Sequence, residues 1–226
     1  MATIVLVHGL WSDGSSWAAV ITELASLGHH PVAAQLALES MGDDVASVRR
    51  TLATVTGPVL LVGWSYGGAV IGEAARDVPA VKALAYVAAF APAEGESVSE
   101  LSRRHPGSLI PAHVMVSDGY TYIHRDHFGE VIAADAPAGA IAIAAAVQRL
   151  VRIGLDRARA GRPAWLDLPS HYLLATQDCA VPPVLQHEMA QRMGATVTWI
   201  DSSHAPMLSR PREVAQFLDS ACAALG

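Results

Sequence analysis

A strand-turn-helix motif in the first third of the chain constrains its fold most strongly. An apolar run at residues 58–62 precedes Gly63-Trp64-Ser65-Tyr66-Gly67-Gly68, and a helix-like stretch follows at 69–76. A sharp turn between strand and helix lifts a serine hydroxyl clear of the sheet, and the glycines leave room for that turn. A phosphate-binding turn is the alternative, but neither Gly-x-Gly-x-x-Gly nor Gly-Lys-Ser/Thr is present. The motif therefore predicts Ser65 as a nucleophile.

The bulk composition indicates one α/β domain over residues 1–226. Hydrophobic residues make up 52% of the chain and charged residues 16%, which favours a compact fold over disorder. The net charge of -6 leaves no basic stripe to bind phosphates, so we expect no nucleic-acid partner. The two cysteines are too few for a disulfide framework.

The N-terminal sequence and the hydropathy pattern bear on location. Met1-Ala2-Thr3 runs directly into an apolar strand, with no basic leader and no small-residue cleavage site. The longest apolar stretch, 136–147, is shorter than the roughly 18 residues that a membrane span needs. We therefore expect a cytoplasmic protein with no membrane partner.

Short apolar runs alternate with longer amphipathic ones, as in βαβ units. The pattern predicts strands at 3–8, 30–35, 58–63, 81–88, 171–176 and 195–200, and helices at 15–27, 43–55, 66–76, 182–193 and 210–224. Asp43 is a candidate N-cap for the second helix. The fold class is thus α/β, with a mostly six-stranded parallel sheet and helices on both faces.

The alternation breaks at residues 91–168, where Pro92, Pro106, Pro111 and Pro137 punctuate the chain. Two helical stretches, 127–134 and 138–155, fit within this insertion. Insertions of this length in a compact domain are usually functional, so we expect a helical cap over the strand ends.

Two further residues fit a catalytic triad with Ser65. Asp178 follows one predicted strand and His204 follows the next, in the chain order Ser, Asp, His of one hydrolase fold. Both therefore lie at the sheet edge that carries Ser65. Asp201 is the competing acid, but it would share the loop of His204, and Glu94 is a weaker alternative.

An acyl-transfer site also needs an oxyanion hole. The backbone N–H of Tyr66 is one expected donor, and the N–H of Leu10, in the loop after the first strand, is the other. Gly9 lets this loop turn toward the substrate oxygen, and the neighbouring His8 is expected to hold the loop. Trp11 and Trp64 are candidates to line a substrate pocket, although packing around the elbow explains them equally well.

Histidines also gather in the insertion. His113, His124 and His127, with Asp118 and Asp126, fit no strong metal-ligand spacing. We therefore expect solvated side chains here and no metal site.

Several motifs together resemble bacterial α/β-hydrolase-fold esterases related to plant methylesterases and hydroxynitrile lyases. They are Val-His-Gly at 7–9, Gly-Trp-Ser-Tyr-Gly-Gly at 63–68, residues 88–97, residues 175–183 and Ser-His at 203–204. The resemblance spans essentially the whole chain. It implies a sheet that lacks the first two strands of the full fold, a helical cap, and cofactor-free hydrolysis of a small or medium apolar carboxylic ester.

The chain departs from the lyases of this group at two positions. They carry a threonine where this chain has Gly9, and a lysine where it has Ala205. A lactonase or thioesterase is the nearer alternative, followed by a cyanohydrin-type lyase and a ligand receptor on the same fold. The partner expected is a small-molecule ester, and either a monomer or a homodimer fits the sequence.

Overall fold

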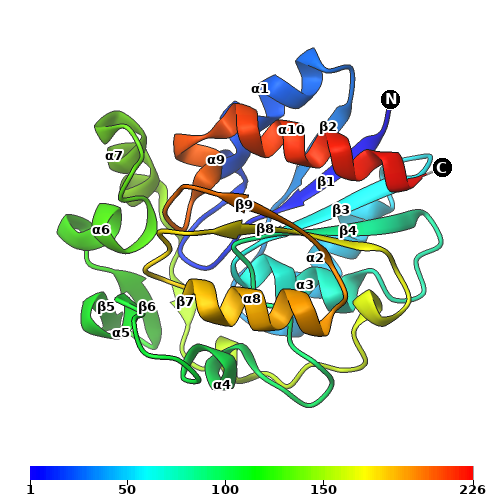
Figure 1. Cartoon of the computed structure of the whole chain (residues 1–226). Coiled ribbons are helices and arrows are strands. Elements are labelled where there is room, and N and C mark those ends of the chain that lie inside the picture. Colours follow the sequence, from blue (N-terminus) through cyan, green and yellow to red (C-terminus); the bar gives the residue numbers. More distant parts are fainter. Residues whose placement is uncertain (226) are drawn as a thin grey trace.

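The computed structural model describes residues 1–225 and contains a six-stranded parallel sheet (Figure 1). Its strands run in the order β2-β1-β3-β4-β8-β9, and each neighbouring pair is parallel. The strands are β1 (Thr3–Val7), β2 (His30–Ala34), β3 (Val59–Trp64), β4 (Val81–Val87), β8 (Ser170–Ala175) and β9 (Thr196–Ile200). All six lie within one residue of the predicted ranges, which confirms the fold class.

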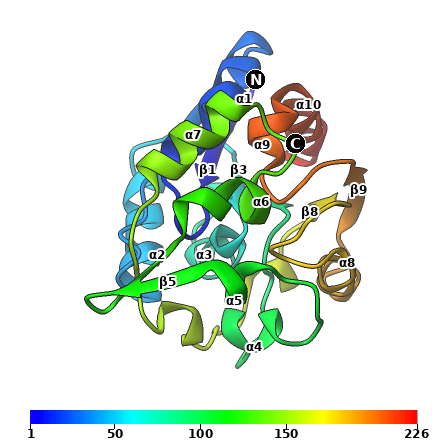
Figure 2. The same ribbon diagram turned by 90° about the vertical axis from the view of Figure 1, so that its left-hand side faces the viewer.

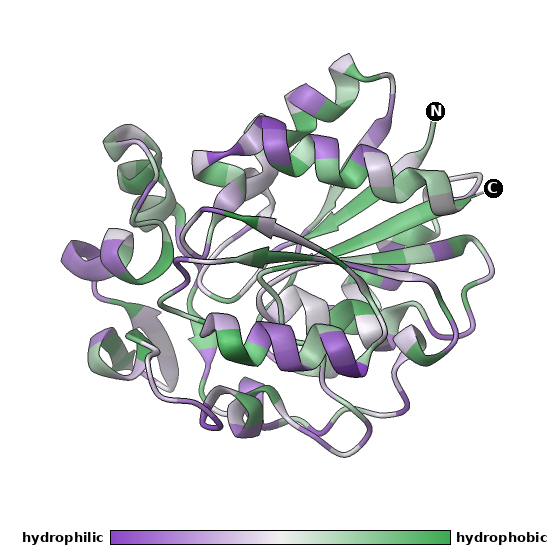
Figure 3. Cartoon of the chain, viewed as in Figure 1, coloured by the Kyte–Doolittle hydropathy of each residue, from purple (hydrophilic) through white to green (hydrophobic). Residues whose placement is uncertain are grey.

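Helices cover both faces of this sheet (Figure 1). One face carries α1 (Ala18–Ser26) and α10 (Pro211–Cys222), and the other carries α2 (Met41–Leu52), α3 (Tyr66–Ala74) and α8 (Pro183–Arg192). The central strands are mostly hydrophobic, whereas these helices mix hydrophobic and hydrophilic residues (Figure 3). Such strands are typical of a parallel sheet buried on both faces.

The start of α2 corrects one expectation. The N-cap is Ser40, whose Oγ accepts a hydrogen bond from the N–H of Asp43 at 3.1 Å. Asp43 therefore lies in the first turn and not at the cap. Its carboxylate still suits this place, because the N-terminal end of a helix attracts negative charge.

The insertion at residues 91–168 lies at the carboxyl ends of the strands, where α6 and α7 pass in front of β1 and β3 (Figure 2). Its helices are α4 (Val98–Ser102), α5 (Ile110–His113), α6 (Phe128–Ile132) and α7 (Ala138–Val147), with the 3-10 turns η2 (Arg125–His127), η3 (Leu155–Arg157) and η4 (Ala164–Leu166). It also contains an antiparallel sheet of β5 (Val114–Ser117), β6 (Tyr120–Ile123) and β7 (Val151–Arg152). The sequence pattern thus predicted a helical cap, but it did not indicate this small sheet.

The last cap helix is also shorter than predicted, because it ends at Val147 and not near residue 155. Directly after it, the Gln148 side chain accepts a hydrogen bond from the N–H of Ile123 and donates one to the Ile123 carbonyl, both at 3.0 Å. These contacts draw the chain out of the helix and toward β6. Among residues 1–225, no helix is long and apolar enough to cross a membrane.

Candidate active site

Ser65 occupies a strained turn between β3 and α3. Its backbone angles, φ 55° and ψ -125°, lie in a region that residues other than glycine seldom adopt. Three backbone hydrogen bonds hold it there: its N–H donates to Val87, and its carbonyl accepts from Gly68 and Phe90. The surrounding backbone thus fixes the serine at the carboxyl edge of the sheet.

The flanking glycines are required by close backbone packing. A Cβ atom at Gly63 would lie 2.5 Å from the carbonyl oxygen of Gly67. A Cβ at Gly67 would lie 2.7 Å from the carbonyl oxygens of Val7 and His8. The elbow therefore packs against the end of β1, which brings Ser65 beside the loop that follows that strand.

Asp178 and His204 meet at the same edge, after β8 and β9. Nδ1 of His204 lies 2.7 Å from Oδ2 of Asp178, and both residues are buried. The other carboxylate oxygen, Oδ1, accepts hydrogen bonds from the N–H groups of Ala180 and Val181 at 2.7 and 2.8 Å. The carboxylate is therefore fixed in orientation and aimed at the imidazole.

The competing acids do not contact the imidazole. Asp201 Oδ1 instead accepts hydrogen bonds from Thr176 and Gln177, each at 3.2 Å. Glu94 is exposed on the surface. Asp178 is thus the carboxylate that binds His204 within residues 1–225.

Trp64 brings the histidine loop to the elbow. Its indole Nε1 donates to the His204 carbonyl at 2.8 Å, and its ring centroid lies 5.4 Å from that of the imidazole. The indole is almost fully buried, so it positions His204 from behind. No hydrogen bond joins Ser65 Oγ and His204 Nε2 within the described residues, and such bonds often tighten only when substrate binds.

The loop after β1 lies directly beside Ser65. A Cβ at Gly9 would approach the Ser65 Cβ to 2.8 Å. Tyr66 is the first residue of α3, so its N–H is one of the helix N-terminal donors that have no acceptor within the helix. The N–H groups of Leu10 and Tyr66 are therefore on the two segments that converge at Ser65.

His8 holds this loop from below and is fully buried. Its Nε2 accepts a hydrogen bond from the Leu36 N–H at 3.0 Å, so Nδ1 carries the proton and donates to the Gly9 carbonyl at 2.9 Å. Burial lowers the pKa of His8 to about 4. A neutral imidazole thus ties the loop to the segment that follows β2.

Sequence reasoning missed two buried side chains that support the site. Gln186 of α8 donates through Nε2 to Asp178 Oδ2 at 2.8 Å and accepts through Oε1 from the Ala175 N–H at 3.1 Å. Asp44 of α2 accepts a hydrogen bond from the Tyr66 hydroxyl at 2.9 Å, and burial raises the pKa of this carboxyl. No local motif marks either residue, because each contact joins separate elements.

The cap contacts these same loops. Trp11 Nε1 donates to Thr121 Oγ1 at 3.2 Å, which joins the loop after β1 to β6. Asp135, just after α6, accepts hydrogen bonds from the N–H and hydroxyl of Ser203. The insertion is therefore bound directly to the segment that carries His204.

Comparison with known proteins agrees with this architecture. The profile of the alpha/beta hydrolase family matches residues 4–217. A carbendazim hydrolyzing esterase of Nocardioides sp. is 36% identical over 115 residues, which are 45% of this chain and 47% of that protein. A pyrethroid hydrolase of Sphingobium wenxiniae is 27% identical and covers 94% of this chain and 85% of its own length.

Solved structures show the same fold. The crystal structure of polyneuridine aldehyde esterase superposes with a TM-score of 0.84 at 19% identity, covering 97% of this chain and 99% of that one. The family match spans almost the whole chain and agrees with the sheet order and the strained serine turn. The chain belongs to the alpha/beta hydrolase family.

Proposed function

We propose that this chain is a carboxylesterase-type serine hydrolase that cleaves esters of small to medium apolar substrates through an acyl-enzyme on Ser65. The buried contact between His204 and Asp178, beside a serine in an elbow conformation, carries the proposal. An imidazole held in this way leaves its other nitrogen, Nε2, as a proton acceptor.

In the acylation step, Ser65 Oγ attacks the ester carbonyl and His204 Nε2 takes the hydroxyl proton. Asp178 keeps the proton on Nδ1 and stabilises the imidazolium. The N–H groups of Leu10 and Tyr66 donate to the oxyanion of the tetrahedral intermediate. His204 then gives its proton to the leaving alcohol as the C–O bond breaks.

In the deacylation step, His204 removes a proton from water, whose oxygen attacks the acyl carbon. The second tetrahedral intermediate collapses, the proton returns to Ser65, and the carboxylic acid leaves. Every proton and electron pair in this scheme passes through Ser65, His204, water or substrate. The proposal therefore requires no cofactor.

A groove between the start of α1 and α7 of the cap supports the apolar substrate class. It has a volume of about 200 Å³ and is lined mostly by small and apolar side chains, including Ile143 and Val147 of α7 and Met207. It also reaches Ser12, two residues after Leu10. The names of two relatives, a carbendazim hydrolyzing esterase and a pyrethroid hydrolase, also favour hydrolysis of a small-molecule ester.

Ala205 favours hydrolysis over cyanohydrin cleavage. The lyases that the sequence resembles carry a lysine at this position, but Ala205 is fully buried. A lysine ammonium buried here would lose its hydration, which costs free energy. At Gly9, the space beside Ser65 is likewise too small for the threonine of those lyases without a shift of the backbone.

The test is turnover of p-nitrophenyl esters, aryl methyl esters and lactones, combined with labelling by a fluorophosphonate. We expect Ser65→Ala to lose about 10⁴-fold or more in kcat and to lose the label, since it lacks the nucleophile. Ser220→Ala, which changes an exposed serine of α10, is the matched control and should retain both. Stoichiometric labelling of a different serine would contradict the proposal.

A further inference from the structure

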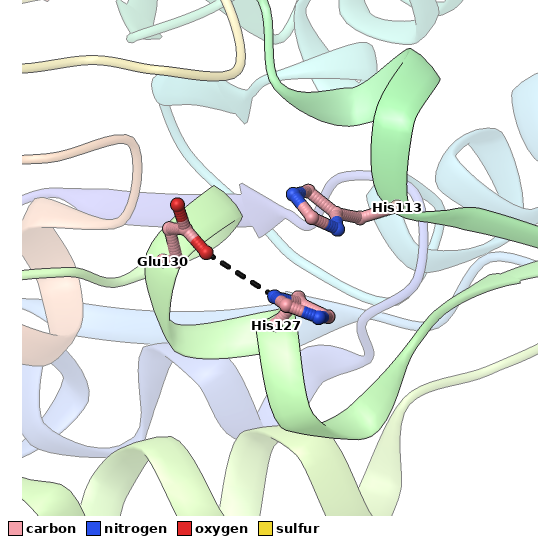
Figure 4. Close-up of side chains that lie close together, drawn as sticks. All are labelled: His113, His127 and Glu130. Carbon is pink, nitrogen blue, oxygen red and sulfur yellow. Dashed lines mark hydrogen bonds and ion pairs between the residues drawn. The ribbon is translucent and has the colours of Figure 1, made fainter.

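Two imidazoles and a carboxylate converge at the base of the β5–β6 hairpin (Figure 4). They belong to His113, the last residue of α5, His127, the last residue of η2, and Glu130 of α6. One potential ligand atom from each lies within 4.8 Å of the other two. The imidazole rings stack with centroids 4.0 Å apart, and His127 Nδ1 lies 3.2 Å from Glu130 Oε2.

The fold builds this cluster from both ends of the hairpin. The N–H of His124 donates to the His113 carbonyl at 2.9 Å and closes the hairpin base. His127 and Glu130 are three residues apart at the start of α6, so their side chains share one side of that turn. The spacing between His113 and His127 fits no ligand motif, because strand pairing and not sequence proximity brings them together.

The chemistry of the three groups suits a borderline transition-metal ion. Imidazole nitrogen and carboxylate oxygen are both ligands of Zn²⁺, and three protein ligands with one water complete a tetrahedron. Within residues 1–225, the ion pair of Glu130 is with His127, so no arginine or lysine competes for the carboxylate. We propose that His113, His127 and Glu130 form a Zn²⁺-binding site.

The geometry requires only small side-chain movements. Tetrahedral Zn²⁺ bonds of about 2.0–2.1 Å place neighbouring ligand atoms about 3.3 Å apart. In this structure the three ligand atoms lie within 4.8 Å of one another, so they need to move closer together. The side chains of His127 and Glu130 are about half exposed and can rotate to close this gap. The ion would then tie α5 to α6.

The site also lies close to the loops that carry the proposed triad. Burial and then the charge of Asp178 raise the pKa of the Cys179 thiol, and Glu130 adds a smaller contribution, so Glu130 lies near the loop that carries Asp178. Beyond α6, Asp135 binds Ser203, next to His204. Metal binding would therefore stiffen a cap segment that contacts both loops, whatever reaction the protein catalyses.

The test is calorimetric titration of the chelator-treated full chain with ZnCl₂, followed by thermal unfolding. We expect one ion per chain, and a Tm increase of about 5–10 °C at a Zn²⁺ concentration a hundred times the Kd. His113→Ala, His127→Ala and Glu130→Gln should each weaken binding by at least about tenfold. Glu130→Gln changes a surface residue and keeps its shape, so it guards against misfolding of the histidine variants.

His30→Ala is the matched control, since it removes an exposed histidine from β2, remote from the cap. It should bind Zn²⁺ as tightly as the unaltered chain. Tetrahedral Co²⁺ absorption that disappears in Glu130→Gln would support the assigned ligands. No saturable binding to the unaltered chain, or affinity in Glu130→Gln and His127→Ala equal to that of the unaltered chain, would overturn the proposal.

Discussion

Gly9 lies so close to Ser65 that the size of one side chain decides the geometry there. In Gly9→Ala, the new Cβ would sit 2.8 Å from the Ser65 Cβ, so the oxyanion loop and the elbow must move apart. A misplacement of about 1 Å at a reacting centre can cost about a hundredfold in rate, and we expect a loss of that order in kcat/KM.

Gly139→Ala provides the control for this prediction, because a Cβ at that position meets nothing within 4 Å. Steady-state kinetics on the best ester of the panel, with unfolding curves for both variants, make the comparison. Equal kcat/KM in the two variants would show that the loop after β1 tolerates displacement, and would count against Leu10 as an oxyanion donor.

The two aspartates near His204 give a second prediction at the scale of single residues. Asp178→Asn should lower kcat by about 10⁴-fold, since an amide in place of the carboxylate no longer selects the catalytic tautomer of the imidazole. Asp201→Asn should change kcat by only a small factor, because the Asp201 carboxylate binds Thr176 and Gln177. Kinetics of both variants on one ester decide the assignment, and the reverse ranking would move the acid to the histidine loop.

At the scale of elements, α8 supports the proposed triad through Gln186, which is fully buried. Gln186→Leu should lower kcat about a hundredfold with little change in KM, because Asp178 loses a partner that orients it. It should also reduce the free energy of unfolding by about 1–3 kcal/mol, since it leaves the Ala175 N–H without an acceptor.

Gln191→Leu makes the same exchange at an exposed position of α8 and should leave both quantities nearly unchanged. A purely structural role for Gln186 would lower stability while kcat of the folded fraction stays normal. Kinetics normalised to the active-site titre separate the two outcomes.

The body of the fold could be predicted because its strands are short, mostly apolar runs, and the central strands β1, β3, β4 and β8 are buried on both faces. The cap was harder to predict, because its β5–β6 hairpin consists of short, half-exposed strands. Its turn did carry a signal: Asp118 and Gly119 both have positive φ, as an Asp-Gly hairpin turn requires. The end of α7 carried no such signal, because its sequence is apolar all round and Gln148 ends it through tertiary contacts.

The candidate site shows the same division. The meeting of Asp178 with His204 follows from their places after adjacent parallel strands, whereas their catalytic roles stay predictions. Gln186, Asp44 and Asp135 could not be found from the sequence, because each acts through a partner on a separate element. Buried polar contacts of this kind depend on how the elements pack.

For the whole molecule, stability against acid depends on His8. The unfolded chain takes up a proton on this imidazole near pH 6.5, whereas the folded chain does so only near pH 4. Between these values the unfolded state binds more protons, so the free energy of unfolding falls as the pH falls. The destabilisation by His8 is absent well above pH 6.5, grows as the pH falls through that value, and reaches about 3 kcal/mol near pH 4.

Urea unfolding at pH 7 and pH 5 tests this dependence. The His8 contribution alone predicts a loss of about 2 kcal/mol over this interval. Glu96 adds little to the change in the free energy of unfolding between pH 7 and pH 5. Its pKa is lowered to about 2, so its contribution to the pH dependence lies below pH 4.5. The raised pKa of Asp44 makes the free energy of unfolding rise as the pH falls, and this effect is the same in the unaltered chain and in a His8 variant.

In His8→Gln the amide can accept a hydrogen bond from the Leu36 N–H and donate one to the Gly9 carbonyl without titrating. The loss of stability between pH 7 and pH 5 should therefore shrink by about 2 kcal/mol. Equal losses in both proteins would exclude His8 as the source of the acid sensitivity.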